Sequence, residues 1–306
     1  MYPTDKLMLT IFTPTYNRAH TLPRLYDSLK RQTCFDFEWL VIDDGSTDKS
    51  QELFCGWTNE RCPFPIRYQR VDNGGKLRAL NQGIQMAKGE YFLILDSDDL
   101  LCEDAVQVIL DSFMAMPSDS SSFIGISMIR GDLSGNPLKR IPKIDPAVGY
   151  VDCSNLERPQ YDLQSDMAEV FYTDKLRRYS FPVWPGEKFT PEEVVWNQMA
   201  LDGYKIRWFD KIVYLCEYQT DGLTNSTWKL LRDNPMGYAM MFNHRLLYSA
   251  GLKDQLNNVV QFISCCFLGG EYKYMCRCNE RMMALLLLPI GWAVSLRRRI
   301  QIRENC

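Results

Sequence analysis

The first hundred residues of the sequence predict an α/β fold in which a mostly parallel, Rossmann-like sheet is flanked by helices. Two observations support this prediction. Apolar segments of strand length alternate four times with segments of helical periodicity, which is typical of a parallel sheet with right-handed crossovers. The conspicuous polar motifs also follow the ends of the expected strands, where open α/β sheets bind their ligands.

Two strand–helix pairs open the chain. The first strand is expected over residues 7–12, and the helix after it begins at Thr21, whose side chain suits an N-cap, with Pro23 in the first turn. The second strand is expected over residues 39–42, and residues 50–57 form the next helix.

Two further pairs follow. The third strand is expected over residues 66–71, and the helix after it opens with Asn-Gly-Gly-Lys and carries its apolar residues on one face. Gly89 is expected to end this helix. Residues 91–95 form the fourth strand, which runs directly into a cluster of three carboxylates.

Beyond this point the pattern is less regular, and strands and loops over residues 115–158 are expected to widen the sheet. Further along we expect a strand over 168–172, short helices over 174–179 and 191–201, and β structure over 205–215; Gly203 ends the helix before it. Amphipathic helices follow from residue 234. The expected organisation is therefore a domain over 1–233, with halves 1–100 and 101–233, and a helical extension over 234–306.

Composition limits the class of protein. With 46% hydrophobic residues the 306-residue chain can bury a sizeable core, and its net charge of −3 argues against a general nucleic-acid binder. The eleven cysteines contain no Cys-x-x-Cys pair, and the N-terminus lacks the apolar stretch of a signal peptide. We expect a cytoplasmic protein with free thiols.

The C-terminal extension contains an apolar run over residues 284–296 that is interrupted by Pro289 and followed by three arginines, Arg297 to Arg299. The run is shorter than the roughly 20 residues that span a bilayer. An interfacial segment that binds anionic lipid headgroups through its arginines fits better. We therefore expect peripheral contact with the inner face of the membrane through residues 281–303; an ordinary core helix is the alternative.

The carboxylate cluster consists of Asp96, Asp98 and Asp99, separated only by Ser97. Two like charges about 4 Å apart repel by on the order of 1 kcal/mol in water and more near a protein surface. A solvated acidic turn would tolerate this. Asp-x-Asp at a strand end is also a pattern that holds Mg²⁺ or Mn²⁺ while leaving positions for phosphate oxygens.

Three other strand-end motifs suit a nucleotide. Asp44 could accept a hydrogen bond from a uracil N3–H or a ribose hydroxyl, and Tyr16 offers a flat face for base stacking. The segment 73–76 allows close backbone approach and supplies a cation for phosphate. Each motif by itself also has a purely structural explanation. Asp44 could belong to a strand-to-helix turn, Tyr16 could be an ordinary loop tyrosine, and residues 73–76 could be an isolated glycine turn.

Together these motifs resemble a known family. The stretches "TIFTPTYNR", "WLVIDDGSTD" and "NGGKLRALNQGIQMAKGEYFLILDSDD", in that order, are similar to family 2 glycosyltransferases of the GT-A fold over residues 7–100. The stretch "EVFYTDKLRRYSFPVWPGEKFTPEEVVWNQMALDGYKI" resembles the acceptor half of bacterial members that build capsule and lipopolysaccharide glycans. The resemblance implies inverting transfer from a nucleotide-diphosphate sugar, helped by Mn²⁺ or Mg²⁺.

The resemblance also implies roles for individual residues. Asp44 would read the base, Asp96 the ribose or a metal-linked network, and Asp98 would be the metal ligand, with Asp99 as its alternate. The first half, 1–100, would hold the nucleotide sugar. The residues expected to contact the donor are Pro14, Thr15, Tyr16, Arg18, Asp44, Asn73, Lys76, Asp96 and Ser97.

The catalytic base is expected in the Glu192-Glu193 pair, which replaces the Glu-Asp pair of the family. In the family the base precedes the glycine that ends this helix by about eleven residues, and Glu192 stands at that distance from Gly203. Adjacent helical residues point about 100° apart, so one glutamate at most can face the site. We expect Glu192, with Glu193 as the alternative and Glu187 as an outside candidate.

The expected function is an inverting hexosyltransferase that uses a UDP-sugar and extends a glycan or lipid-linked glycan in surface polysaccharide synthesis. Sugar transfer to polyprenyl phosphate is a second possibility, and a catalytically inactive sugar-nucleotide-binding subunit is a third. UDP is favoured because Asp44 suits the uracil edge. The sugar, the linkage and the acceptor depend on loops over residues 123–185 that no motif defines.

Overall fold

The structure, a computed structural model, describes residues 7–138, 142–163, 166–216 and 227–305. Its residues group into two compact units. Unit 1 comprises Met1–Ser180 and Trp196–Tyr218, and unit 2 comprises Phe181–Val195 and Gln219–Cys306. The expected domain boundary at residue 233 falls within unit 2. Residues 181–195, which were expected in the first domain, belong to unit 2 together with the C-terminal helices.

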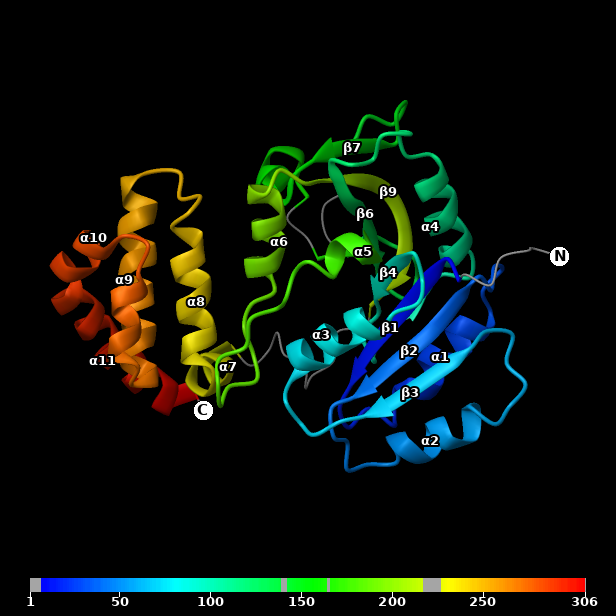
Figure 1. Cartoon of the computed structure of the whole chain (residues 1–306), viewed down its shortest axis with the longest axis horizontal. Helices are drawn as coiled ribbons and strands as arrows, with labels where there is room; N and C mark the ends of the chain where they lie inside the picture. Colours follow the sequence, from blue (N-terminus) through cyan, green and yellow to red (C-terminus); the bar gives the residue numbers. More distant parts are fainter. Residues whose placement is uncertain (1–6, 139–141, 164–165, 217–226, 306) are drawn as a thin grey trace. The chain divides into compact units, whose positions relative to one another are not determined.

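Unit 1 is built on a nine-stranded sheet with the order β3-β2-β1-β4-β8-β6-β9-β5, and β7 pairs with β9 (Figure 1). The first four strands in the chain, β1 to β4, are parallel neighbours, which confirms the predicted strand–helix alternation. They and the helices between them are β1 (Leu9–Thr15), α1 (Leu22–Lys30), β2 (Phe37–Asp43), α2 (Ser50–Trp57), β3 (Ile66–Arg70), α3 (Lys76–Met86) and β4 (Tyr91–Ile94).

The second half of unit 1 widens this sheet, as predicted. Strand β8 (Met167–Tyr172) runs antiparallel between β4 and β6 (Phe123–Gly131), and β9 (Lys205–Leu215) pairs parallel with β6. The remaining elements are β5 (Leu100–Leu101), α4 (Ala105–Met114), β7 (Tyr150–Cys153), the 3-10 helix η1 (Asn155–Tyr161), α5 (Thr173–Leu176) and α6 (Glu193–Leu201), whose first residues belong to unit 2.

Two expected element ends differ from the structure. Strand β1 continues through Pro14, which pairs with Ile42 of β2, so the strand ends at Thr15 rather than at Phe12. Helix α3 ends at Met86, before Gly89. Gly89 instead lies against β1, where a Cβ atom would come within 2.3 Å of the Thr10 nitrogen. The glycine is therefore required by close backbone packing.

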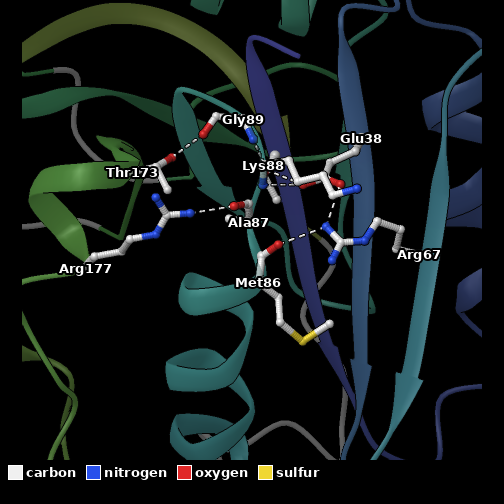
Figure 2. A network of polar contacts seen from close by, with 9 residues as sticks. Glu38, Arg67, Met86, Ala87, Lys88, Gly89, Thr173 and Arg177 are labelled. Carbon is white, nitrogen blue, oxygen red and sulfur yellow. Dashed lines mark hydrogen bonds and ion pairs between the residues drawn. The ribbon is translucent and has the colours of Figure 1, made fainter. Parts of the chain in front are cut away.

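A buried polar network holds the C-terminal end of α3 on the sheet (Figure 2). The Glu38 carboxylate accepts hydrogen bonds from the Thr10 hydroxyl and the Lys88 N–H, both at 2.7 Å, and from Arg67 at 2.9 Å. Arg67 also donates to the Met86 carbonyl oxygen at 2.9 Å. Buried charges are tolerated when they are paired in this way. The network fixes the C-terminal end of α3, and the N-terminal end of the same helix begins at Lys76, near the ends of the parallel strands.

Unit 2 is helical. Its helices are α7 (Thr227–Asp233), α8 (Pro235–Arg245), α9 (Leu252–Gly269), the 3-10 helix η3 (Tyr272–Arg277), α10 (Arg281–Leu286) and α11 (Leu288–Asn305). Phe262 and Ile263 of α9 are fully buried in its core. Gly291 of α11 lies so close to α9 that a Cβ atom would come within 2.4 Å of Ile263.

The apolar run of the extension is thus divided between α10 and α11, with Pro289 in the first turn of α11, where proline is tolerated. Among the described helices, none combines the length and apolar character needed to cross a membrane.

Candidate functional site

The glycine-rich turn before α3 is held by Asp44, which follows β2. The Asp44 carboxylate accepts the backbone N–H of Gly74 at 2.7 Å, that of Gly75 at 2.8 Å, and the Asn73 amide at 3.1 Å. Gly75 has φ +95°, a conformation that favours glycine. Asp44 therefore shapes the turn from which α3 begins, a role that the sequence analysis did not foresee.

The turn places Lys76, the first residue of α3, beside the end of β4. The Lys76 ammonium group lies 2.8 Å from the Asp96 carboxylate. Burial alone would raise the pKa of Asp96, but the charges of Lys76 and Arg130 outweigh it and hold that pKa below its usual range. Asp96 is therefore ionised, and it links the α3 and β4 motifs as their order in the sequence suggested.

Two residues from the second half of unit 1 complete this cluster, and neither was predicted from the sequence. Arg130 of β6 lies 3.9 Å from the Asp96 carboxylate and 4.0 Å from that of Asp99. The Tyr214 hydroxyl of β9 accepts the Asp96 N–H and donates to Asp99, both at 2.9 Å. One signal was available: Arg130 stands in an apolar strand, and a buried arginine requires an acidic partner.

Asp99 and Asp98 have different surroundings. Burial and the neighbouring Asp96 charge raise the pKa of Asp99 to about 7, against the effect of Arg130. The same two causes raise the pKa of the half-buried Asp98, where Arg18 acts in the opposite direction. Arg24 reaches the backbone carbonyl oxygen of Asp98 at 3.0 Å rather than its carboxylate. Additional positive charge at the cluster would favour the ionised form of both carboxylates.

The loops after β1 and β2 are tied together. The Asn17 N–H donates to the Ser46 hydroxyl at 2.8 Å, and the Asn17 side chain accepts the Thr47 N–H at the same distance. Thr21 stands at the N-cap of α1, as predicted, but its hydroxyl donates to the Ser97 carbonyl oxygen at 2.8 Å instead of capping the helix. These bonds join the first, second and fourth strand ends.

Two side chains near the end of β1 are suited to bind a ligand. Tyr16 is 48% exposed. The buried hydroxyl of Thr15, directly after Pro14, has no hydrogen-bond partner within the described ranges. Buried polar atoms in folded proteins nearly always have a partner, so the Thr15 hydroxyl is suited to hydrogen-bond a molecule that binds at this edge.

The described residues contain no group of three or more metal-ligating side chains. A divalent ion that binds together with a diphosphate does not need one, because Mg²⁺ is typically held by one or two carboxylates plus phosphate oxygens and water. Asp96 and Asp98 supply two carboxylates at one strand end. The donor set therefore fits a cation that binds with its substrate.

The glutamates proposed as bases lie in unit 2. Glu193 accepts two hydrogen bonds from Arg245 of α8, at 2.6 and 2.7 Å. Glu187 is buried and accepts the N–H groups of Met236 and Gly237 at 2.7 Å each, which caps the start of α8. Glu192 precedes the first turn of α6, where its carbonyl oxygen accepts the Val195 N–H at 2.9 Å.

Comparisons with known proteins agree with this architecture. The family model described as Glycosyl transferase family 2 matches residues 10–143. The chain is 30% identical over 112 residues to glycosyltransferase GlyG of Streptococcus pneumoniae serotype 4, a match that covers 37% of each protein. It is 38% identical over 109 residues to chondroitin synthase of Pasteurella multocida, covering 35% of this chain and 11% of that protein. The matched stretch thus covers less than half of either relative.

Two solved structures share the fold. S. aureus TarS 1–349 in complex with UDP-GlcNAc has a TM-score of 0.60 at 15% identity, covering 97% of this chain and 90% of that one. The mannosyltransferase PcManGT of Pyrobaculum calidifontis, in complex with GDP-Man and Mn²⁺, has a TM-score of 0.55 at 17% identity, covering 99% and 85%. Residues 10–143 therefore match glycosyl transferase family 2, and the protein has the GT-A type of fold.

Proposed function

We propose that this protein is an inverting glycosyltransferase that moves a sugar from a nucleotide-diphosphate donor, favoured to be a UDP-sugar, to a glycan or lipid-linked glycan in surface polysaccharide synthesis. The observation that carries the proposal is the strand-end edge of unit 1. There the Asp44-bound glycine turn, Lys76 and the carboxylates of Asp96 and Asp98 come together. The family match and the bacterial glycan-synthesising relatives support the reaction class.

The donor nucleotide would lie along the loops after β1 and β2. Tyr16 offers an exposed ring for the base, and the Thr15 hydroxyl offers a buried hydrogen-bonding group. A carboxylate has about four acceptor positions, and Asp44 uses three on Asn73, Gly74 and Gly75. The remaining position suits a single N–H donor such as the uracil N3–H.

The diphosphate would be held by positive charge around the acidic cluster. Lys76 and Arg18 are cations at this edge that suit phosphate oxygens, and Asp98 with Asp96 would hold Mn²⁺ or Mg²⁺. Such an ion, when bound, neutralises the charge that builds on a departing diphosphate. Because Lys76 lies on one oxygen of Asp96, that carboxylate would be shared between the lysine and the cation.

Glu192 is the favoured general base, which takes the proton from the acceptor hydroxyl as it attacks the anomeric carbon. Glu192 is favoured because it stands eleven residues before Gly203. Glu193 binds Arg245 through both carboxylate oxygens, and Glu187 caps α8. The bidentate contact with Arg245 holds the Glu193 carboxylate in one orientation.

Helices α10 and α11 would contact the inner face of the cell membrane. Several large apolar side chains on these helices are exposed. Six of them, from residues 282–292, are named here the apolar face: Met282, Leu285, Leu286, Leu288, Ile290 and Trp292. Exposed arginines, among them Arg281 and Arg297, flank this face and suit anionic headgroups. Arg298 is different because it binds Ser264 and Cys265 of α9. The buried side of α11 packs on α9. The membrane contact proposed here involves only the exposed side of the same helix.

A donor panel tests the enzymatic proposal. Purified protein would be mixed with UDP-, GDP- and dTDP-sugars, with Mn²⁺ or with EDTA, and its melting temperature measured. A ligand at 100 times its Kd stabilises the native state by about 2.7 kcal/mol, which corresponds to a rise of about 5–10 °C. A Mn²⁺-dependent rise with a UDP-sugar is expected. The absence of a rise with every donor would contradict the proposal, and binding without donor hydrolysis or transfer would indicate an inactive subunit.

A further inference from the structure

Arg130 is held in a fixed position beside the acidic cluster. Its Nε donates to the Met167 carbonyl oxygen at 2.9 Å, and its guanidinium group lies 4.2 Å from the centre of the Tyr214 ring. The same guanidinium group faces both the Asp96 and the Asp99 carboxylates. The guanidinium group of Arg130 is therefore fixed beside the cluster, and it also interacts with the Glu169 carboxylate.

Tyr214 connects Arg130 to the backbone of the cluster. The two residues are partners in the parallel pairing of β6 and β9, and Tyr214 is fully buried. Its hydroxyl binds the Asp96 N–H on one side and the Asp99 carboxylate on the other. Strands β6 and β9, which are distant in sequence from β4, thus help to position the carboxylates of Asp96 and Asp99.

We propose that Arg130 is a positioning residue that acts as the built-in counter-cation of the acidic cluster, holding Asp96 and Asp99 in place before a divalent cation and the donor bind. The identity of the ligand rests on the proposed function. The physical reason is that neighbouring carboxylates repel each other, and the repulsion is stronger for the buried Asp99 and the partly buried Asp96 than it would be in water. Lys76 offsets the charge of Asp96, whereas Arg130 is the cation that lies between Asp96 and Asp99.

The chain contains a matched arginine for comparison. Arg207, in the same strand as Tyr214, binds both carboxylate oxygens of Asp152 at 2.8 Å and lies 3.8 Å from the Tyr150 ring centre. Like Arg130, it is a mostly buried arginine that contacts a tyrosine ring and an aspartate. It lies about 20 Å along β9 from Tyr214, so it reproduces the local chemistry without the carboxylate cluster.

The test compares Arg130→Met with Arg207→Met by melting temperature, in EDTA and in millimolar Mn²⁺, with no nucleotide present. Each substitution removes one partner of a buried pair and should lower the melting temperature by about 5–10 °C in EDTA. For Arg130→Met, Mn²⁺ should recover at least about half of the deficit, because a divalent cation replaces the missing positive charge. Arg207→Met should show the same deficit with and without Mn²⁺, and NaCl of equal ionic strength should rescue neither.

The variant Arg130→Lys keeps the positive charge but not the planar guanidinium group, so it separates the effect of the charge from that of the side-chain shape. It should melt above Arg130→Met in EDTA and gain less from Mn²⁺, and it keeps the test available if Arg130→Met does not fold. Equal Mn²⁺ responses of Arg130→Met and wild type, or a Mn²⁺ rescue of Arg207→Met, would overturn the proposal. Since no nucleotide is used, failure of this test is distinguishable from failure of the donor panel.

Discussion

Two regions of the protein depart from ordinary burial in opposite directions. The strand-end edge of unit 1 buries charge: Asp44 and Asp99 are 5% and 7% exposed. The apolar face of unit 2 exposes hydrocarbon: Met282 and Leu286 are 74% and 77% exposed. Charged side chains are rarely buried without partners, and large exposed apolar patches mark binding surfaces.

The two regions differ in where the partners of these unusual side chains are found. At the strand-end edge it is inside the chain, since Asp44 binds backbone N–H groups and Asp96 binds Lys76. On the apolar face the side chains are exposed, and the partner proposed for them is a second molecule, the membrane. We therefore expect substitutions at the first region to change chemistry, and substitutions at the second to change location.

The largest effect is expected at Asp98. Asp98→Ala should reduce sugar transfer by about 10³-fold or more, and EDTA should abolish transfer that Mn²⁺ or Mg²⁺ then restores, because cation stabilisation of the leaving diphosphate is lost. Initial rates of product formation measure both. Folding should be retained, since removal of Asp98 relieves repulsion from Asp96. Asp111→Ala, an exposed carboxylate on α4, is the control. Full activity after exhaustive dialysis against EDTA would show that no divalent cation is needed.

The second effect separates the adjacent glutamates. Glu192→Gln keeps the side-chain volume but cannot accept the acceptor's proton, so turnover should fall by about 10²–10⁴-fold with donor affinity nearly unchanged. Glu193→Gln weakens the pair with Arg245 and should chiefly lower the melting temperature. Steady-state kinetics and donor titration on both variants measure this. Inactivity of Glu193→Gln alone would reverse the assignment, and activity of both would move the base elsewhere.

The third effect concerns the apolar face. Deleting residues 281–306 would uncover the α9 core, because Gly291 packs on Ile263, so substitution is the sharper test. Leu285→Gln with Leu286→Gln should weaken binding to anionic vesicles by about 10–100-fold, since two leucines no longer enter the lipid. Added salt should weaken wild-type binding.

Met114→Gln, an equally exposed apolar residue on α4, is the control for this measurement and should leave vesicle binding unchanged. Wild-type protein that ignores anionic vesicles at low salt would show that the face has another partner.

The smallest effect is a pH dependence. The pKa of Asp99 is about 7 in the folded protein and near 4 when unfolded. The unfolded state therefore loses its proton first, and the contribution of Asp99 to stability declines as the pH rises from about 4 through 7. In EDTA, Asp99→Asn should remove this decline and melt about 2–5 °C above wild type near pH 8, with little difference near pH 4. Parallel melting curves over this range would mean that Asp99 titrates normally.

Much of the fold was predictable because it depends on local patterns. The apolar runs and helical periodicities up to β4 correspond to elements that the structure contains, and their parallel order follows from the alternation. The ends of β1 and α3 were predicted incorrectly because tertiary contacts determine them: β2 extends β1 through Pro14, and Gly89 serves packing against Thr10.

The site was predictable where its residues follow strand ends. Lys76 and Asp96, both expected at strand ends, lie side by side, although their ion pair was not predicted. Arg130 and Tyr214 were missed because each acts through a partner more than thirty residues away, across β6 and β9. Neither strand carries a motif, so only the pairing of the sheet reveals that these side chains meet Asp96 and Asp99.

The most direct test of the strand-end site is the electron paramagnetic resonance signal of free Mn²⁺, titrated with protein in the presence and absence of UDP. Bound Mn²⁺ loses this signal. The two-carboxylate donor set predicts weak Mn²⁺ binding to the protein alone and stronger binding when UDP is added, beyond the binding of Mn²⁺ to UDP alone. Asp98→Ala should lose that enhancement. Mn²⁺ binding that is unchanged by UDP, or an enhancement that persists in Asp98→Ala, would contradict a cation site shared between this strand end and a donor diphosphate.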